Sequence, residues 1–287
     1  MAEKKKITER IQATEKTYQI TSAMNMVSTA KLRRVEKKLK SFKPISDSIR
    51  DTMNSLLLNN PDLSSKAFIE NEKKPCYILI ASDRGLIGNY NNALFRYFDE
   101  FVSKHFKSKD DFLVATMGFK AFSFAKKKGY NILNKESQNI RDDVIFVDFE
   151  EVANSIVEGY LNGSVGKTVM IYNSFVNTMS FKIKVTQILP IKLDLERAKK
   201  DNTEYIFEPS KQEVLDKLIK LDVSYTMYRI ILEAKTSEHA ARMNSMKNAS
   251  DNAKEVEEKL TLLYNHARQN QITTELTDII NGSSAVN

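Results

Sequence analysis

Residues 210–281 read SKQEVLDKLIKLDVSYTMYRIILEAKTSEHAARMNSMKNASDNAKEVEEKLTLLYNHARQNQITTELTDIIN, and this stretch decides the fold of the 287-residue chain. It contains neither glycine nor proline, each of which costs roughly 1–3 kcal/mol inside a helix. Seam positions follow one another in steps of four and three; they are Val214, Leu218, Leu221, Tyr225, Tyr228, Leu232, Lys235, His239, Arg242, Met246, Ala249, Ala253, Val256, Leu260, Leu263 and Ala267. Such a repeat predicts one long coiled-coil helix.

The first 57 residues carry the same alternation. Their seam positions are Ile7, Ile11, Thr14, Tyr18, Thr21, Asn25, Ser28, Leu32, Val35, Leu39, Phe42, Ser46, Ile49, Met53 and Leu56. Pro44 should kink or split this helix. At ~1.5 Å per residue the two helices would be roughly 75 and 100 Å long, which exceeds the diameter of a small domain. We therefore expect the two ends of the chain to pair as an antiparallel coiled coil that forms a projecting shaft.

The period changes between the two ends. Short apolar runs predict strands, amphipathic runs predict helices, and the two kinds alternate. The expected strands are 76–82, 111–118, 167–175 and 181–191, and the expected helices are 91–106, 119–129 and 147–163, the last with Asp148 as N-cap. The last two strands should form a hairpin. The fold class is therefore α/β: a small domain with a largely parallel sheet (70–205), inserted between an N-terminal helix (1–60) and a C-terminal helix (210–287).

Composition narrows the function classes. The chain has one cysteine, Cys76, which argues against disulfides and thiolate metal sites. There is no apolar run of 18 residues and no signal-peptide pattern at the N-terminus, so we expect neither a membrane span nor a cleaved signal. The net charge of +7 is localised. Residues 1–60 hold 13 Lys and Arg against 6 Asp and Glu, and the rest of the chain holds 31 of each.

That basic charge is densest between Lys31 and Lys43, with only Glu36 opposing it. One interpretation is a solvated helix face. Another is a track for an acidic partner or an anionic surface. Nucleic acid is the weakest option because no aromatic residues are interleaved for base stacking.

Two segments bear on nucleotide binding. SDRGLIGNYN (82–91) is a Gly-x-x-Gly loop between an expected strand and helix, which offers backbone amides to a phosphate. GSVGKT (163–168) ends like a P-loop, but Leu161 stands where the motif requires its first glycine, and a strand follows. No paired carboxylates, nucleophilic triad or metal-ligand spacing stands out. We expect a non-catalytic chain with no cofactor or metal of its own.

Both seams become polar or small over one stretch. In the first it is Thr21, Asn25 and Ser28, and in the second it is Lys235, His239 and Arg242. Such positions either specify the register of a coiled coil or mark where the pair loosens and meets another surface. Beyond Ala267 the seam ends, yet 272–280 keeps helical spacing. We expect the C-terminal helix to outlast its partner and expose an apolar end.

Five blocks, in order along the chain, resemble the ATP synthase gamma subunit. They are ITSAMNMVSTAKLRR (20–34), SDRGLIGNYN (82–91), NSFVNTMS (173–180), TSEHAARMNSMKNASDNA (236–253) and YNHARQNQITTELTDIINGSSAV (264–286). The resemblance implies a rotary-motor central stalk, present in one copy, whose coiled coil turns inside a hexamer of alpha and beta subunits. It also implies contact with the epsilon subunit and a membrane rotor ring. ATP, ADP and Mg would be bound on the partner subunits, and ATP synthesis would be coupled to hydrogen ion transport at the cytoplasmic face of the cell membrane.

The resemblance also implies roles for individual residues. Residues expected to contact the hexamer are Met24, Lys31, Arg33, Arg34, Arg84, Arg242, Arg268, Gln269, Thr273 and Glu275. Tyr205 and Glu208 fall in the segment expected to meet the membrane ring. The chain departs from the family pattern at Ser22, Ile87 and Asn89, where lysine, cysteine and glycine are usual.

Three alternatives stay open from the sequence. A divergent rotary ATPase would use the same shaft to drive other machinery. A scaffold protein would form homodimers through a parallel coiled coil. A nucleotide-binding enzyme would use the α/β domain and bind ATP tightly as an isolated chain.

Overall fold

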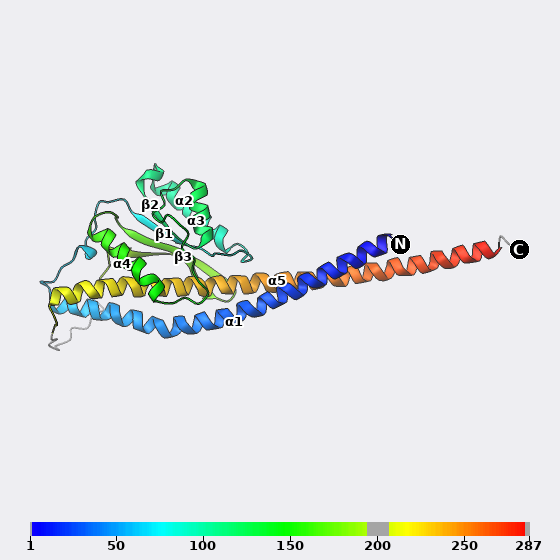
Figure 1. The fold of residues 1–287 in the computed structure, drawn as a ribbon, viewed down its shortest axis with the longest axis horizontal. Coiled ribbons are helices and arrows are strands. Elements are labelled where there is room, and N and C mark those ends of the chain that lie inside the picture. The colour runs from blue at the N-terminus through cyan, green and yellow to red at the C-terminus, as the bar shows by residue number, and fades with distance from the viewer. Residues whose placement is uncertain (1, 194–206, 285–287) are drawn as a thin grey trace. The chain divides into compact units, whose positions relative to one another are not determined.

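The computed structural model describes the backbone of residues 2–193 and 207–284 (Figure 1). The helices are α1 (Ala2–Asn59), α2 (Tyr90–His105), α3 (Phe119–Lys128), α4 (Val147–Leu161) and α5 (Lys211–Ser284), with short 3-10 turns at Lys66–Phe68 and Lys109–Asp111. The strands are β1 (Cys76–Ile80), β2 (Leu113–Met117), β3 (Thr168–Asn177) and β4 (Ser180–Leu189). Two compact units are present. The terminal unit combines α1 up to Ser28 with α5 from Arg242, and the central unit is Thr29–Ala241.

The sheet of the central unit has the order β2-β1-β3-β4. β1 pairs in parallel with β2, Cys76 opposite Leu113, and with β3, Cys76 opposite Thr168. β4 is antiparallel to β3 and forms the edge. The predicted hairpin and the predicted largely parallel sheet are therefore confirmed. Parallel strands require crossover connections, which here contain α2, α3 and α4.

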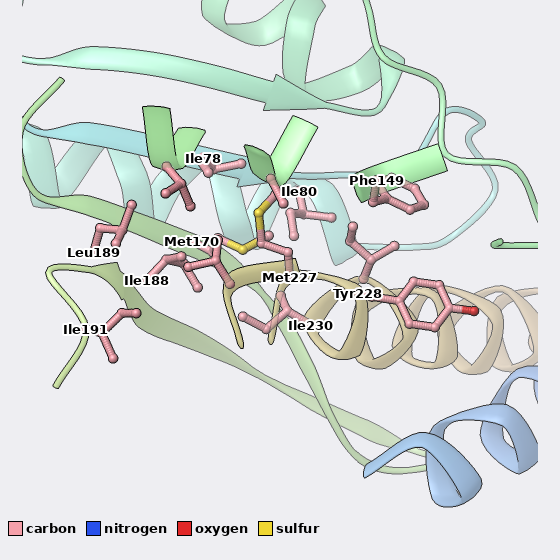
Figure 2. Close-up of a cluster of buried hydrophobic side chains, with 14 of the residues drawn as sticks. Ile78, Ile80, Phe149, Met170, Ile188, Leu189, Ile191, Met227, Tyr228 and Ile230 are labelled. Carbon is pink, nitrogen blue, oxygen red and sulfur yellow. The ribbon is translucent and has the colours of Figure 1, made fainter. Parts of the chain in front are cut away.

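Helices cover both faces of the sheet. On one face, α2 and α3 pack against β1. Leu94 and Phe98 of α2, Ala121 of α3, Phe112 and Leu79 of β1 belong to one buried cluster. On the other face, α4 and α5 pack on the inward side chains of β1 and β3, as Met170, Met227 and Ile230 show in Figure 2. β1 is buried at every position, because both of its faces are covered and side chains alternate between them.

The helix from 147 begins differently from its prediction. Phe146 occupies the N-cap position of α4, and Asp148 lies within the first turn. A carboxylate there still interacts favourably with the helix N-terminus through the macrodipole. The prediction of Asp148 as the N-cap was therefore wrong by two residues.

In the central unit, α1 and α5 run antiparallel to one another. Phe42 stacks on Tyr225 with ring centroids 5.1 Å apart. Further along α1, Arg50 donates from Nε and Nη2 to the two carboxylate oxygens of Asp222, at 2.5 and 2.6 Å. Burial raises the pKa of Asp222, and the hydrogen bonds from Arg50 oppose that effect. The pair thus fixes one helix against the other, although its desolvation offsets much of the attraction.

In the terminal unit the same antiparallel pairing continues between the two chain ends. Asn25 donates from Nδ2 to the backbone oxygen of Met243 at 2.8 Å, and the Lys4 ammonium lies 5.5 Å from the Tyr264 ring centre. The expected pairing of the ends of one chain is therefore present in both units.

The seam predicted for α1 is confirmed, because each of its positions is buried or half-buried. The seam predicted for α5 is wrong in part. Val256 and Leu263 are 43% and 55% exposed, and the neighbours Glu257 and Tyr264 are half-buried instead. A straight helix has 3.6 residues per turn, so the buried stripe drifts from a strict 3.5-residue repeat. Leu221 is also exposed.

α1 continues through Pro44 without interruption, so of the two expected effects of this proline, a kink or a split, the split is absent. Proline lacks the N–H that would bond to the carbonyl of Lys40, and its ring crowds that carbonyl. Because Pro44 is exposed, Pro44→Ala should raise the free energy of unfolding by about 1–2 kcal/mol, after allowance for the freer unfolded chain. Urea denaturation followed by circular dichroism measures this, with the exposed Lys43→Ala as control. A destabilised Pro44→Ala would contradict the expectation.

Helix α5 outlasts its partner, as expected. Residues 272–277 and 279–281 are all exposed. They lie beyond Tyr264, whose ring is near Lys4 at the start of α1. Within the described residues, no helix combines the length and apolarity that crossing a bilayer requires.

Candidate partner-binding surfaces

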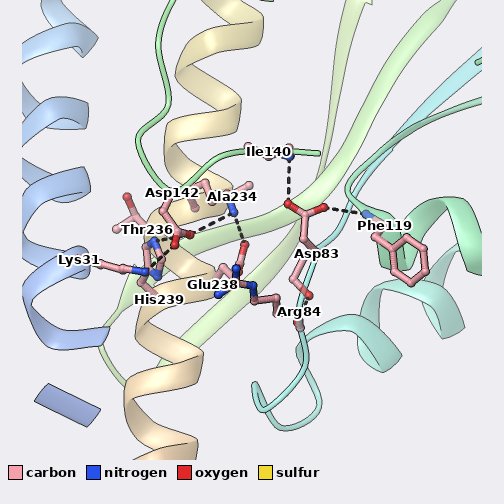
Figure 3. Close-up of polar contacts among 12 residues, drawn as sticks. Lys31, Asp83, Arg84, Phe119, Ile140, Asp142, Ala234, Thr236, Glu238 and His239 are labelled. Carbon is pink, nitrogen blue, oxygen red and sulfur yellow. Dashed lines mark hydrogen bonds and ion pairs between the residues drawn. The ribbon is translucent and has the colours of Figure 1, made fainter. Parts of the chain in front are cut away.

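The loop between β1 and α2 is a structural junction. Asp83 accepts the backbone N–H of Phe119 at Oδ1 (2.8 Å) and that of Ile140 at Oδ2 (3.0 Å), as Figure 3 shows. Phe119 is the first residue of α3. The Asp83 carboxylate therefore occupies a helix N-terminus, the place where a phosphate would otherwise bind. The arrangement argues against the phosphate-loop interpretation of 82–91.

The rest of this loop holds neighbouring elements together. Asn91 and Ser82 exchange two hydrogen bonds. Tyr90 donates its hydroxyl to the backbone oxygen of Ala234 on α5 at 2.9 Å, and Asn173 of β3 donates to the backbone oxygen of Tyr90 at 3.0 Å. A structural role thus accounts for most of the polar side chains in the SDRGLIGNYN block.

The second phosphate-like segment also has a structural explanation. Thr168 is the first residue of β3, and its hydroxyl donates to the backbone oxygen of Gly166 at 3.1 Å. The segment therefore opens a strand, as expected from the sequence, whereas a P-loop opens a helix. Across the described part of the chain, no three His, Cys, Asp or Glu side chains lie together in a way that could hold a metal ion.

The basic residues of α1 fall into two groups, those that pair with carboxylates of this chain and those that are exposed. Lys31 contacts Asp142 at 2.5 Å, while Lys38 and Arg34 contact Asp143 at 3.0 and 3.4 Å. Both carboxylates belong to the connection before α4. The expected partner contacts Lys31 and Arg34 are thus engaged within the chain, and Arg33 is exposed. The sequence did not predict Asp142 and Asp143 as partners of α1. Its only hint was that two acidic residues stand next to each other while α1 carries many basic ones.

The polar stretch of the α5 seam is a buried ionic cluster. Lys235 and His239 have side chains only 3% and 1% exposed. Lys235 Nζ lies 3.0 Å from Glu238 and 3.8 Å from Asp142, and His239 Nε2 lies 3.7 Å from Asp142. Burial raises the pKa of Asp142, but the hydrogen bond from Lys31 and the charges of Lys235 and His239 outweigh it and lower the pKa. The side chains of Lys235, Glu238 and His239 are therefore buried within the central unit.

The polar stretch of the α1 seam specifies register. The half-buried Asn25 crosses to α5 through its hydrogen bond to Met243, and a polar contact of this kind between two helices favours one alignment. Ser28 is buried and donates to the carbonyl of Met24 in its own helix at 2.7 Å. Two expected contact residues of the terminal unit, Met24 and Arg242, are half-buried.

The free end of α5 carries four of the expected contact residues. Arg268, Gln269, Thr273 and Glu275 are all exposed. Large apolar side chains share this end of the helix and are exposed as well; they are Leu262, Leu263, Ile272, Leu276, Ile279 and Ile280. A grouping of exposed apolar side chains of this size marks a protein–protein contact more often than a solvated surface.

The remaining expected contact residues lie apart from this end. Arg84 is exposed in the loop between β1 and α2. Glu208 is exposed shortly before α5. Tyr205 lies outside the described residues, so its predicted role stays a prediction.

Comparisons with known proteins agree with this geometry. A family model described as ATP synthase matches residues 3–286. The chain is similar to a chain from Tetrahymena thermophila mitochondrial ATP synthase (central stalk and c-ring), with 22% identity, a TM-score of 0.61 and coverage of 80% of this chain and 99% of that one. Two Euglena gracilis mitochondrial ATP synthase structures also match at 18% identity. One is of the rotor in rotational state 1 (TM-score 0.64, covering 94% and 99%) and the other of OSCP/F1/c-ring in rotational state 3 (0.65, covering 99% and 95%). At these identities the structural likeness shows a shared fold.

Proposed function

Because the chain belongs to the ATP synthase family as a gamma-type central stalk subunit, we propose that it is the rotor shaft that turns inside a hexamer of alpha and beta subunits. The single observation that carries this proposal is the end of α5, where exposed apolar residues surround Arg268 and Gln269 beyond the paired part of the coiled coil. A helix end of this composition is stable in water only at some cost, which insertion into a partner removes.

The proposed mechanism is mechanical. Three catalytic sites on the hexamer bind ATP, ADP and Mg, and this chain contributes asymmetry instead of catalytic groups. As the shaft turns, the hexamer contacts a different side of the helix pair, so each catalytic site passes through a different state. Met24, Arg242 and the basic residues Arg33 and Arg84 are proposed contacts of the hexamer. Coulomb attraction between exposed charges extends only about 8–10 Å in physiological salt, so these residues guide the contact without fixing it.

The proposed partners beyond the hexamer are an epsilon subunit and a membrane rotor ring, with one copy of this chain per complex. Glu208 and Tyr205 are the proposed ring contacts. The complex would lie at the cytoplasmic face of the cell membrane and couple hydrogen ion transport to ATP synthesis. Two of the similar structures are complexes that include a c-ring, which supports this assignment. A shaft that drives other machinery is the alternative.

The test reconstitutes the full chain with its alpha and beta subunits and compares it with a chain that ends at Ala267. Truncation removes Arg268, Gln269 and the apolar end, so rotation driven by ATP hydrolysis should lose torque. The central unit should stay folded, because the removed residues belong to the terminal unit. The double variant Arg268→Ala/Gln269→Ala separates the polar contacts from the apolar ones. Unchanged torque in the truncated chain would overturn the contact role of this helix end.

The purified full-length chain also distinguishes the rotor shaft from the other candidate functions. The intramolecular pairing of α1 with α5 favours a monomer, whereas a homodimeric scaffold would have twice the chain mass by light scattering. A nucleotide-binding enzyme would bind ATP as an isolated chain. Purification from cells, followed by identification of the associated subunits, distinguishes an ATP synthase from a shaft that drives other machinery.

A further inference from the structure

The connection between α3 and α4 contains a segment, residues 138–146, that joins the sheet to both long helices of the central unit. We call it the strap. Its first part is held at the sheet: the backbone N–H of Gly118 donates to the Gln138 oxygen at 2.7 Å, and the Ile140 N–H donates to Asp83. Its last part contacts the helices, because the Val144 oxygen accepts from Lys38 Nζ at 3.1 Å and from the Tyr228 hydroxyl at 3.0 Å.

The middle of the strap carries the charged contacts. Asp142 lies near Lys31 of α1 and His239 of α5 (Figure 3). A third basic side chain, Lys235 of α5, lies 3.8 Å from it. The next residue, Asp143, instead contacts Lys38 and Arg34 of α1. One short segment thus binds both helices and the sheet at once.

Asp142 and Asp143 differ in how much they contribute to stability. The pairs of Asp143 are exposed, and exposed pairs stabilise by about 0–1 kcal/mol. Asp142 instead approaches the buried side chains Lys235 and His239. Two ammonium groups, Lys31 and Lys235, are there balanced by two carboxylates, Asp142 and Glu238. Asp142 and Lys31 are each 40% exposed, and Glu238 remains beside the buried Lys235 if Asp142 is removed. Removing Asp142 takes the nearby carboxylate from the buried His239 and one of two from the buried Lys235, which costs more than losing a pair between exposed side chains.

Apolar packing alone sets the alignment of α1, α5 and the sheet less sharply than the charged contacts do. Phe146 packs against Phe42 of α1 and Tyr225 of α5, at 6.4 and 4.8 Å between ring centres. Hydrophobic burial itself is non-directional, so it is the shape of the packed rings that resists displacement of the helices. Ion pairs and hydrogen bonds with defined geometry oppose those displacements.

We propose that Asp142 is a positioning residue that fixes α1 and α5 to the α/β sheet, so that the helices and the sheet turn as one body. This role rests on the proposed function of the chain as a shaft. The strap then carries torque between the paired helices and the α/β part, in parallel with the apolar contacts of α5 on the sheet.

The first test examines the strap in the isolated full-length chain by hydrogen exchange. Asp142→Asn should raise amide exchange in residues 138–146 and in α1 near Lys31 by about tenfold or more. Asp142→Glu keeps the charge and should restore part of the protection. The control is Asp62→Asn, an exposed aspartate that follows α1 and removes the same charge. Unchanged protection in Asp142→Asn would overturn the proposal.

The second test measures torsional stiffness in the complex with alpha and beta subunits. A bead is attached through Lys107→Cys, an exposed position on the α/β part; Cys76 is buried, and burial raises its thiol pKa to about 12, so it stays unreactive. Asp142→Asn should reduce the stiffness, read from angular fluctuations of the bead, by about twofold while the rate of ATP hydrolysis is kept.

The two readouts separate the possible failures. Loosened exchange with unchanged stiffness would show that Asp142 holds the strap only structurally, and the torque role would be wrong. A bead that does not rotate on the unmodified chain would overturn the proposed shaft function and the torque role with it. The exchange experiment would still decide whether Asp142 holds the strap.

Discussion

Gly118→Ala is expected to lower the free energy of unfolding by about 2–6 kcal/mol. Gly118 follows β2 and precedes α3 with φ +92°, a conformation that side chains with a Cβ rarely adopt. A Cβ at this position would lie 2.0 Å from the carbonyl oxygen of Ala81. That oxygen belongs to the backbone at the end of β1, where the Ala81 N–H is itself bonded to Met117, so it cannot move without disturbing the strand pair.

A matched control lies in the adjacent loop. A methyl group at Gly85 would meet open space, with no atom within 4 Å, so Gly85→Ala should change stability by less than about 0.5 kcal/mol. Urea denaturation is best followed by near-ultraviolet circular dichroism of the tyrosines, since the chain has 11 tyrosines and no tryptophan. Equal effects of the two substitutions would contradict the steric explanation.

Phe98→Ala is expected to lower the free energy of unfolding by about 3–5 kcal/mol. Phe98 of α2 is fully buried and meets the rings of Tyr77, Phe112 and Tyr130 edge-on, with centroids 6.0, 6.3 and 5.7 Å away. Truncation removes the apolar burial and leaves a cavity among rigid rings that cannot collapse into it.

Two variants calibrate this effect. Phe98→Leu should cost clearly less, about 1–2 kcal/mol, because most of the volume is kept. Arg96→Ala, at a more exposed position on the same helix, should be nearly neutral. The same denaturation measurement applies. A loss below about 1 kcal/mol for Phe98→Ala would mean that this face of the sheet is not a closely packed core.

The regular elements were predictable because local patterns specify them. β1 is a short apolar run after Pro75, and α3 ends at Gly129 in a left-handed conformation as a helix stop requires. The long stretch without glycine or proline is α5, which continues through Gly282 to Ser284. The seam of α1 was also predictable, since its apolar positions have exposed polar neighbours. On α5 the choice between Val256 and Glu257, or between Leu263 and Tyr264, depends on the facing helix, and sequence spacing does not contain that information.

The candidate surfaces were only partly predictable. The exposed end of α5 follows from a seam that stops while helical spacing continues. The engagement of Lys31 and Arg34 by Asp142 and Asp143 does not, because these partners are about a hundred residues apart in the chain and only the tertiary fold brings them together. Similarly, the role of Asp83 at α3 depends on Phe119 and Ile140, neither of which carries a polar side chain.

The pairing of the two chain ends has a consequence for biosynthesis. Asn25 reaches Met243, 218 residues later, and Arg50 reaches Asp222, 172 residues later. At roughly 5–20 residues per second, α1 leaves the ribosome about 10–40 s before its partner. During that interval its apolar stripe is unprotected. The excess positive charge of the first 60 residues then repels other nascent copies, which should keep the early helix soluble until α5 arrives.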